Sequence, residues 1–316
     1  MKDFNIYAFG GTGITVLNKY LSIGKNSRFV DQVIGVDTSE ANPVEDGMYP
    51  VLRLEGAEGS GGDRTAHRPK FEDFAKQIFA KHAPSKLNIL VYSLAGGTGS
   101  SIGPYALRYL LQKKIPVLVV CVGDISTLKE QENTVDTLGS MYNQSQLNKV
   151  PVVFSYLENT PEVSQGEINR RACSIIDNAL MMFNLKNERI DYADLKNFFY
   201  FTDVVKADPI MTQLTFLGDA DLPNYKRKPV AAISLYNDID DIRVPFENML
   251  YRKSGLFGSE FAGAEHSIHA VLDHGSTLES LKQIIADREE KTNELAGIFK
   301  NVEANPFGAG SSDGMI

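Results

Sequence analysis

The stretch LNILVYSLAGGTGSS, residues 87–101, decides the fold of this chain. An apolar run from Leu87 to Tyr92 leads into a glycine cluster, and a helical segment follows at Ile102 to Leu111. Glycine after a strand lets the backbone pass close to a phosphate, and the free amides and dipole of the next helix hold the anion. The pattern predicts a phosphate-binding strand, loop and helix, whose loop is Ala95-Gly96-Gly97-Thr98-Gly99-Ser100-Ser101.

A second glycine loop follows the first predicted strand. The run Asn5 to Phe9 leads into Gly10-Gly11-Thr12-Gly13, and helical spacing continues to about Leu21. In a doubly wound sheet, loops after parallel strands lie at one edge, where ligands bind. Either loop alone is compatible with a simple tight turn, but the two together favour a phosphorylated ligand.

Apolar runs and helical segments alternate through the first half of the chain. Near-continuous apolar strands separated by helices indicate a parallel sheet covered on both faces. The expected fold class is α/β, with a doubly wound, mostly parallel nucleotide-binding sheet. The further strands are expected at 33–36, 117–122 and 151–157, and a further helix at 71–82.

The second half has a different organisation. Ser164 and Glu167 have capping-box spacing and open an apolar helix of about twenty residues, which we expect to be a buried connector. A smaller α+β domain is expected next, with strands at 230–236 and 269–272 and a helix at 244–252; a long helix from Ser276 and a tail at 304–316 follow. The predicted division is a nucleotide-binding domain at 1–163, a central helix at 164–186, a second domain at 187–275, and the C-terminal helix and tail at 276–316.

Composition excludes several classes of protein. The 316 residues include 43% hydrophobic and 23% charged residues, which is ordinary for globular proteins, and the net charge of -8 argues against a general nucleic-acid surface. Only two cysteines occur, Cys121 and Cys173, so a disulfide framework or a cysteine zinc site is not expected. With no long apolar run and no signal-peptide pattern, we expect a cytoplasmic protein without a membrane partner.

Two classes of nucleotide-binding protein can be compared with these motifs. The P-loop pattern GxxxxGK[ST] is missing from the sequence, which excludes P-loop NTPases. An NAD-dependent oxidoreductase on a Rossmann-type sheet stays open, because Asp37 ends the second strand about twenty residues after the first glycines. Against it, the first loop reads GGTG rather than GxGxxG, and a dinucleotide fold gives no reason for the cluster at 95–101.

Other candidate residues lie outside these two loops. A third glycine stretch, with Gly61 and Gly62, is either a surface loop or a lid over a terminal phosphate. Asp191 and Asp194, three apart at a helix start, fit helix capping. Asn169 is either an exposed polar residue or an amide that reads a base edge. Asn133 and Thr134 are further candidates for ribose contact.

The glycine cluster and several motifs around it resemble the tubulin/FtsZ superfamily. Ala95 to Ser101 is similar to the signature GGGTGSG and departs from it at the first and last glycines. The resemblance runs in order over roughly residues 4–200. It includes Gly10–Gly13 (first phosphate loop), Asp37-Thr38 (loop near the metal), Gly59–Arg64 (γ-phosphate loop), Leu157-Glu158-Asn159-Thr160 (tubulin VENT), Ile168-Asn169-Arg170 (LNR) and Asn187–Leu195 (FtsZ NVDFADV).

The resemblance implies a GTPase that uses GTP/GDP and Mg²⁺ and polymerises head-to-tail with itself. It assigns the phosphates to the three glycine loops, the ribose to Glu158 and guanine to Asn169. The resemblance also implies that Asp191 and Asp194 are the catalytic acids and that the next subunit supplies them, so that hydrolysis waits for assembly.

Chain length points to one branch of the superfamily. A compact body with a long last helix and a short tail resembles the tubulins of large bacteriophages, the PhuZ family. This implies a filament in the cytoplasm of an infected bacterium that positions phage DNA or the replication compartment, without direct nucleic-acid binding. An acidic tail is expected in that family, whereas residues 304–316 carry one acid, Asp313.

Overall fold

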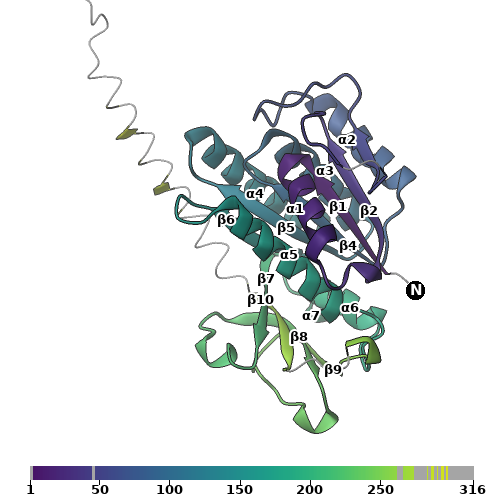
Figure 1. Ribbon diagram of the computed structural model, residues 1–316. Coiled ribbons are helices and arrows are strands. Elements are labelled where there is room, and N and C mark those ends of the chain that lie inside the picture. The colour runs from purple at the N-terminus through teal and green to yellow at the C-terminus, as the bar shows by residue number, and fades with distance from the viewer. Residues whose placement is uncertain are drawn as a thin grey trace, which may run out of the picture.

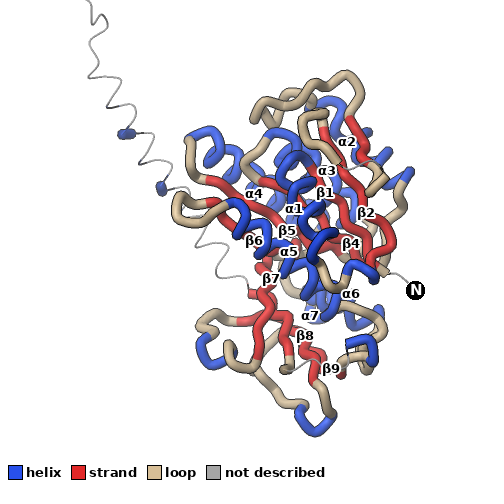
Figure 2. The backbone as a smooth tube through the Cα atoms, viewed as in Figure 1, coloured by secondary structure: helices blue, strands red, loops and turns tan. Residues whose placement is uncertain are grey.

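The computed structural model describes residues 3–44, 47–261 and 266–273, with isolated positions between 283 and 297. Its strands form one sheet in the order β3-β2-β1-β4-β5-β6-β7-β10-β8-β9 (Figure 1, Figure 2). The strands are β1 (Phe4–Phe9), β2 (Val30–Asp37), β3 (Val51–Arg53), β4 (Leu87–Ser93), β5 (Val117–Asp124), β6 (Val152–Asn159), β7 (Met211–Gly218), β8 (Pro229–Tyr236), β9 (Tyr251–Leu256) and β10 (Ile268–Asp273).

The strands from β3 to β7 run parallel, and helices cover them on both sides. Strands β1, β4 and β5 are buried along almost their whole length, as expected for apolar strands between two helix layers. Helix α1 packs against α5 in one layer, and α3 packs against α2 and α4 in the other. The helices are α1 (Gly10–Ile23), α2 (Arg68–Lys81), α3 (Gly97–Gln112), α4 (Leu128–Asn148), α5 (Gln165–Met182), α6 (Tyr192–Phe199) and α7 (Phe201–Val205). The predicted doubly wound, mostly parallel sheet is confirmed.

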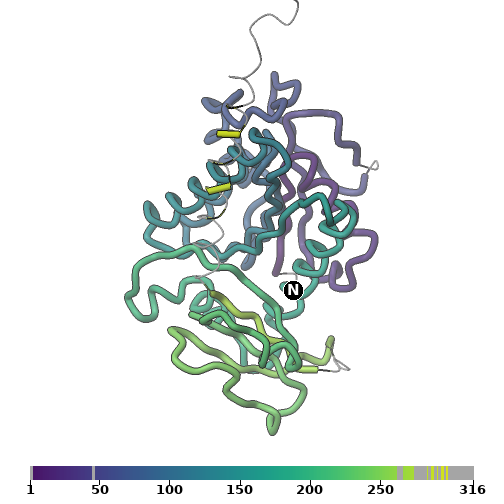
Figure 3. Tube along the Cα trace, turned by 90° about the vertical axis from the view of Figure 1, so that its left-hand side faces the viewer, coloured from purple at the N-terminus to yellow at the C-terminus, as the bar shows by residue number. Residues whose placement is uncertain are grey.

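The last strands extend the sheet into the lower body of Figure 3. Strand β10 pairs antiparallel with both β7 and β8, and β9 pairs parallel with β8. Leu217, Ala232 and Val271 form a small second core there, against which Phe246 and Met249 pack. Within the described ranges, no helix combines the length and apolar character that a membrane span requires.

Some sequence expectations need correction. The helix expected at 244–252 is wrong: residues 244–250 are irregular, Asn248 has a left-handed φ of 56°, and Tyr251 starts β9. Ser164 caps α5 as expected, but the Glu167 side chain pairs with Arg170 and Arg171 instead of reaching back. Helix α4 and strands β3 and β7 were not predicted. The C-terminal helix and tail lie outside the described residues, apart from the isolated positions.

Candidate functional site

The two predicted phosphate loops meet at the carboxyl edge of neighbouring strands. Strands β1 and β4 pair side by side, and the strand order reverses between them, which is where open α/β sheets bind ligands. Gly10 has a φ of 67°, and a Cβ there would lie 3.1 Å from the backbone N of Gly99 and 3.2 Å from Cβ of Thr98. The loops therefore touch at a point that only glycine fits.

The first turns of α1 and α3 also pack closely against the strand backbone. A Cβ on Gly13 would lie 2.4 Å from the carbonyl oxygen of Val91, and one on Gly99 would lie 3.1 Å from the carbonyl oxygen of Phe9. Among the residues that the structure describes, no side chain caps the start of α1 or α3, and neither first turn carries an acid. By contrast, Thr127, Ser164 and Asp191 cap α4, α5 and α6. The first amides of α1 and α3 are thus left for an anion.

The third glycine loop packs against the glycine cluster at 95–101. Thr38 Oγ1 lies 2.6 Å from Thr98 Oγ1 and 3.1 Å from Ser60 Oγ, which links the loop after β2 to both. A Cβ on Gly97 would lie 2.5 Å from Cβ of Ser60 and 3.2 Å from the backbone N of Gly62. The structure therefore brings Gly61 and Gly62, both with left-handed φ, beside the cluster at 95–101.

Helix α4 stabilises these loops through side-chain hydrogen bonds to their backbone. Asn133 is buried, and its Nδ2 donates to the carbonyl oxygens of Gly62 and Ala95, both at 2.8 Å. Thr134 is buried too and hydrogen-bonds with the backbone of Asp124. Both side chains are buried and bonded to backbone groups, and their contact with ribose stays a prediction. The sequence does contain a pattern that indicates the start of α4: Thr127 is followed three residues later by Glu130, the spacing of a capping box.

Asp37 stabilises the conformation of the loop after β2 through hydrogen bonds. It is buried, Oδ1 accepts the N–H of Thr38 at 2.7 Å, and Oδ2 accepts from Asn42 at 2.8 Å. Among the described residues, no group of three His, Cys, Asp or Glu side chains could hold a metal. Mg²⁺ fits such a site all the same, since it is commonly held by phosphate oxygens, water and only one or two protein groups.

The candidates for ribose and base contact lie at the same edge of the sheet. Glu158 stands near the end of β6 and accepts the hydroxyl of Tyr156 at 2.9 Å. Asn169 lies near the start of α5 and is half-buried, and its side chain has no hydrogen bond within the described part of the chain. Both side chains keep acceptor or donor positions open for a ligand.

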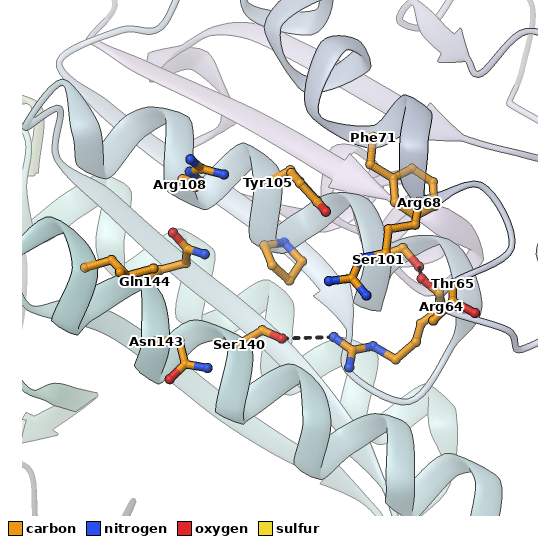
Figure 4. Close-up of a pocket in the computed structure, with 12 residues that line it drawn as sticks. Arg64, Thr65, Arg68, Phe71, Ser101, Tyr105, Arg108, Ser140, Asn143 and Gln144 are labelled. Atoms are coloured by element: carbon orange, nitrogen blue, oxygen red, sulfur yellow. Dashed lines mark hydrogen bonds between the residues drawn. The ribbon is translucent and has the colours of Figure 1, made fainter.

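A cationic cavity of about 360 Å³ adjoins the third glycine loop (Figure 4). Arg64, Arg68 and Arg108 line it, together with Phe71 and Tyr105. Arg64 reaches α4, where it donates to Ser140 Oγ at 3.0 Å and pairs with Asp136 at 3.4 Å. Its carbonyl oxygen accepts from Ser101 at 2.7 Å. Arg64 thus ties the end of the third loop to both α3 and α4.

The predicted acids lie at the opposite edge of the sheet. Helix α5 starts after the carboxyl end of β6 and runs back over about 27 Å, at 1.5 Å per residue for its 18 residues. The loop after it carries Asp191 and opens α6, close to where the chain begins (Figure 1). Asp191 is exposed, and Asp191 and Asp194 cap the helix reciprocally. One chain therefore does not bring these acids to its own glycine loops.

Comparisons with known proteins agree with this architecture. No protein-family model matches the chain. It is 26% identical over 303 residues to a phage tubulin-like protein of Pseudomonas phage 201phi2-1, covering 94% of this chain and 92% of that protein. The solved structure of the phage tubulin PhuZ with GDP has a TM-score of 0.88 at 24% identity, and the PhuZ201 filament has one of 0.85 at 24%; each covers 99% of both chains.

These comparisons do not favour the NAD-dependent oxidoreductase. The chain has the fold of the tubulin/FtsZ superfamily and is similar in sequence to phage tubulin-like proteins, which confirms the resemblance that its motifs predicted.

Proposed function

We propose that this chain is a GTPase that binds GTP and Mg²⁺ at the carboxyl edge of its sheet and assembles head-to-tail into filaments. The observation that carries the proposal is the placement of the two halves of the site. The glycine loops lie at one edge and exposed Asp191 lies at the other, so a second copy is needed to bring them together.

The proposed reaction joins two subunits. A water molecule attacks the γ-phosphorus, the bond to the β–γ bridging oxygen breaks, and a water proton passes to the Asp191 carboxylate of the neighbour. The products are GDP and inorganic phosphate. The amides of α1 and α3 hold the phosphates, while bound Mg²⁺ would screen their charge. Glu158 and Asn169 are proposed to contact ribose and guanine.

The similar proteins support the nucleotide and the filament. One similar structure is a phage tubulin with GDP, and another is a filament. The relative from Pseudomonas phage 201phi2-1 is a phage protein. We infer that the filament of this chain works in the cytoplasm of an infected bacterium and positions phage DNA or the replication compartment. Fluorescence imaging of phage DNA in infected cells that express Asp191→Asn tests this role; unchanged DNA position would contradict it.

The decisive experiment compares two Asp→Asn variants. Asn caps helices about as well as Asp but is no base, so Asp191→Asn should keep fold and GTP affinity. Phosphate release should fall on the order of 100-fold, the range typical of a lost general base. Asp238→Asn is the matched control, since Asp238 caps the exposed turn Ile239–Asp241.

A dilution series of the wild type completes the test. Turnover per subunit should rise steeply above a threshold concentration, together with light scattering. A turnover that is constant on dilution, or an Asp191→Asn variant as active as Asp238→Asn, would refute the shared site.

A further inference from the structure

We propose that Tyr156 is a positioning residue for the sugar of the nucleotide: its hydroxyl fixes one carboxylate oxygen of Glu158 and leaves the other to accept from the ribose hydroxyls. The inference rests on the proposed function, in which Glu158 contacts ribose. It deepens that function by naming the substrate class, because a carboxylate held in this way favours ribonucleotides over deoxyribonucleotides.

The end of β6, which carries both residues, has support from one neighbouring strand. Strand β6 pairs with β7 over Val152–Phe154 and with β5 as far as Asn159. The last four residues of β6 are half-buried, whereas the first four are buried. A glutamate side chain has several rotatable bonds, so Glu158 needs a further contact if it is to keep one orientation at this open end of the strand.

Tyr156 provides that contact. Alternation along the strand places Tyr156 and Glu158 on the same face of the sheet. The Tyr156 hydroxyl donates to Oε1 of Glu158 at 2.9 Å. Within the described part of the chain this is the one hydrogen bond of the Glu158 carboxylate, and Oε2 has no partner. One oxygen is therefore held by the protein, and the other can accept a hydrogen bond from a ligand.

Strand β5 leaves the space in which the tyrosine ring lies. Gly123 of β5 pairs in register with Glu158. A Cβ on Gly123 would lie 2.6 Å from Cε2 and 2.7 Å from Cζ of Tyr156, which is closer than carbon atoms approach without a shift. Glycine at this position therefore lets the hydroxyl of Tyr156 lie beside Glu158, and any larger residue would displace the ring.

The chemistry of the pair suits a sugar with free hydroxyl groups. Burial raises the pKa of Tyr156 well above its ordinary value, and the nearby Glu158 carboxylate raises it further, so the phenol stays a donor. An ionised carboxylate only accepts hydrogen bonds, and ribose presents hydroxyl donors to it. A site built to bond a hydroxyl discriminates against the analogue that lacks it, because its polar group is then left without a partner.

The first experiment measures the affinity of the full chain for GTP and for dideoxy-GTP, the analogue that lacks both ribose hydroxyls. The wild type should bind GTP more tightly, on the order of tenfold. Tyr156→Phe keeps the ring but loses the donor, so GTP affinity should fall on the order of fivefold while dideoxy-GTP affinity stays unchanged. Gly123→Ala should lower the ratio of the two affinities in the same direction, because it displaces the ring.

Tyr225→Phe is the matched control. The Tyr225 hydroxyl also donates to a carboxylate, at 2.8 Å, but its acceptor is Asp273 on β10. A merely structural role of Tyr156 would weaken the binding of both nucleotides equally and leave the ratio of affinities as in the wild type. Equal wild-type affinities for the two nucleotides, an unchanged ratio in Tyr156→Phe, or the same change in Tyr225→Phe would overturn the proposal.

A double substitution tests whether Tyr156 acts through Glu158. Glu158→Ala removes the carboxylate, so adding Tyr156→Phe to it should lower GTP affinity no further. A further loss as large as that of Tyr156→Phe alone would contradict the inference. Failure of the proposed function itself would look different, because the wild type would then show no saturable binding of either nucleotide.

Discussion

At the carboxyl edge of the parallel strands, Gly10, Gly13, Gly97 and Gly99 lie within contact distance of neighbouring loops or strand backbone. At the opposite edge lies the acid loop, residues 187–194. Lys253 and Tyr251 contact Asp194 there, and Glu188 exchanges two backbone hydrogen bonds with Leu256 of β9. The first region is shaped by steric fit, and the second by charge and hydrogen bonds from one strand.

This difference predicts different sensitivities. A loop built on glycine contacts has no room for an added methyl group, so substitutions there should damage binding abruptly. A loop held by an ion pair and hydrogen bonds tolerates changes of shape but depends on pH and salt. Binding and turnover should therefore be separable by mutations at opposite edges of one sheet.

The largest effect is expected at Gly97. In Gly97→Ala, the new Cβ would lie 2.5 Å from Cβ of Ser60, so the loop at 59–63 must move away from the cluster. We expect GTP affinity, measured by fluorescent-nucleotide titration, to fall on the order of 100-fold, or about 2.8 kcal/mol.

Gly139→Ala is the matched control for this change. Gly139 lies inside α4, and nothing lies within 4 Å of the position that a Cβ would take there, so alanine should leave affinity unchanged and stabilise the helix by about 1 kcal/mol. Equal affinities of the two variants would show that steric fit does not govern the carboxyl edge.

An intermediate effect, on the free energy of unfolding, is expected from a substitution at Asn133. Asn133→Ala leaves two buried carbonyl acceptors, on Gly62 and Ala95, without their donor, which should lower the free energy of unfolding by about 2 kcal/mol. Urea unfolding measures this loss. Asn143→Ala on the exposed side of α4 should change stability by less than about 0.5 kcal/mol. A similar loss in both variants would remove Asn133 from the support of the loops.

Helix α4 shows why the sequence predicted some elements and not others. The glycine loops and the first parallel strands were predictable because their signal is local: apolar runs followed by glycine. Helix α4 lacked such a signal, because its buried face includes the polar residues Gln131, Asn133, Thr134 and Thr137. These side chains bond to neighbouring backbone, or to partners elsewhere, rather than forming an apolar stripe, so periodicity did not find them.

The wrong helix prediction at residues 244–252 has a related reason. Residues 244–252 alternate apolar and polar groups at helical spacing, but Phe246 and Met249 cover the small second core as irregular chain, and Tyr251 begins a strand beside β8. The partners of Asp194 come from that strand, 57 residues along the chain from it in the case of Tyr251. Local sequence predicted the cap at Asp191 but had no access to contacts that tertiary pairing creates.

The smallest effect is expected in the pH dependence of stability at the acid loop. The hydrogen-bonded Asp194 has a pKa below its ordinary value in the folded chain, so its contribution to stability is complete above the unfolded pKa of about 4 and is lost as pH falls through the folded value. Asp194→Asn keeps the side-chain shape but does not titrate. The urea midpoint of the variant should therefore fall less than that of the wild type between pH 5 and pH 3, by a fraction of the total change.

Asp31→Asn provides the control, since Asp31 is exposed on β2 and makes no hydrogen bond or ion pair within the described ranges. Its midpoint should follow the wild type across the same pH range, because an exposed carboxylate without a charged or hydrogen-bonding partner adds no interaction that the substitution could remove. If Asp194→Asn followed the wild type as closely, charge would not be what holds the acid loop. The two edges of the sheet would then both depend on steric fit.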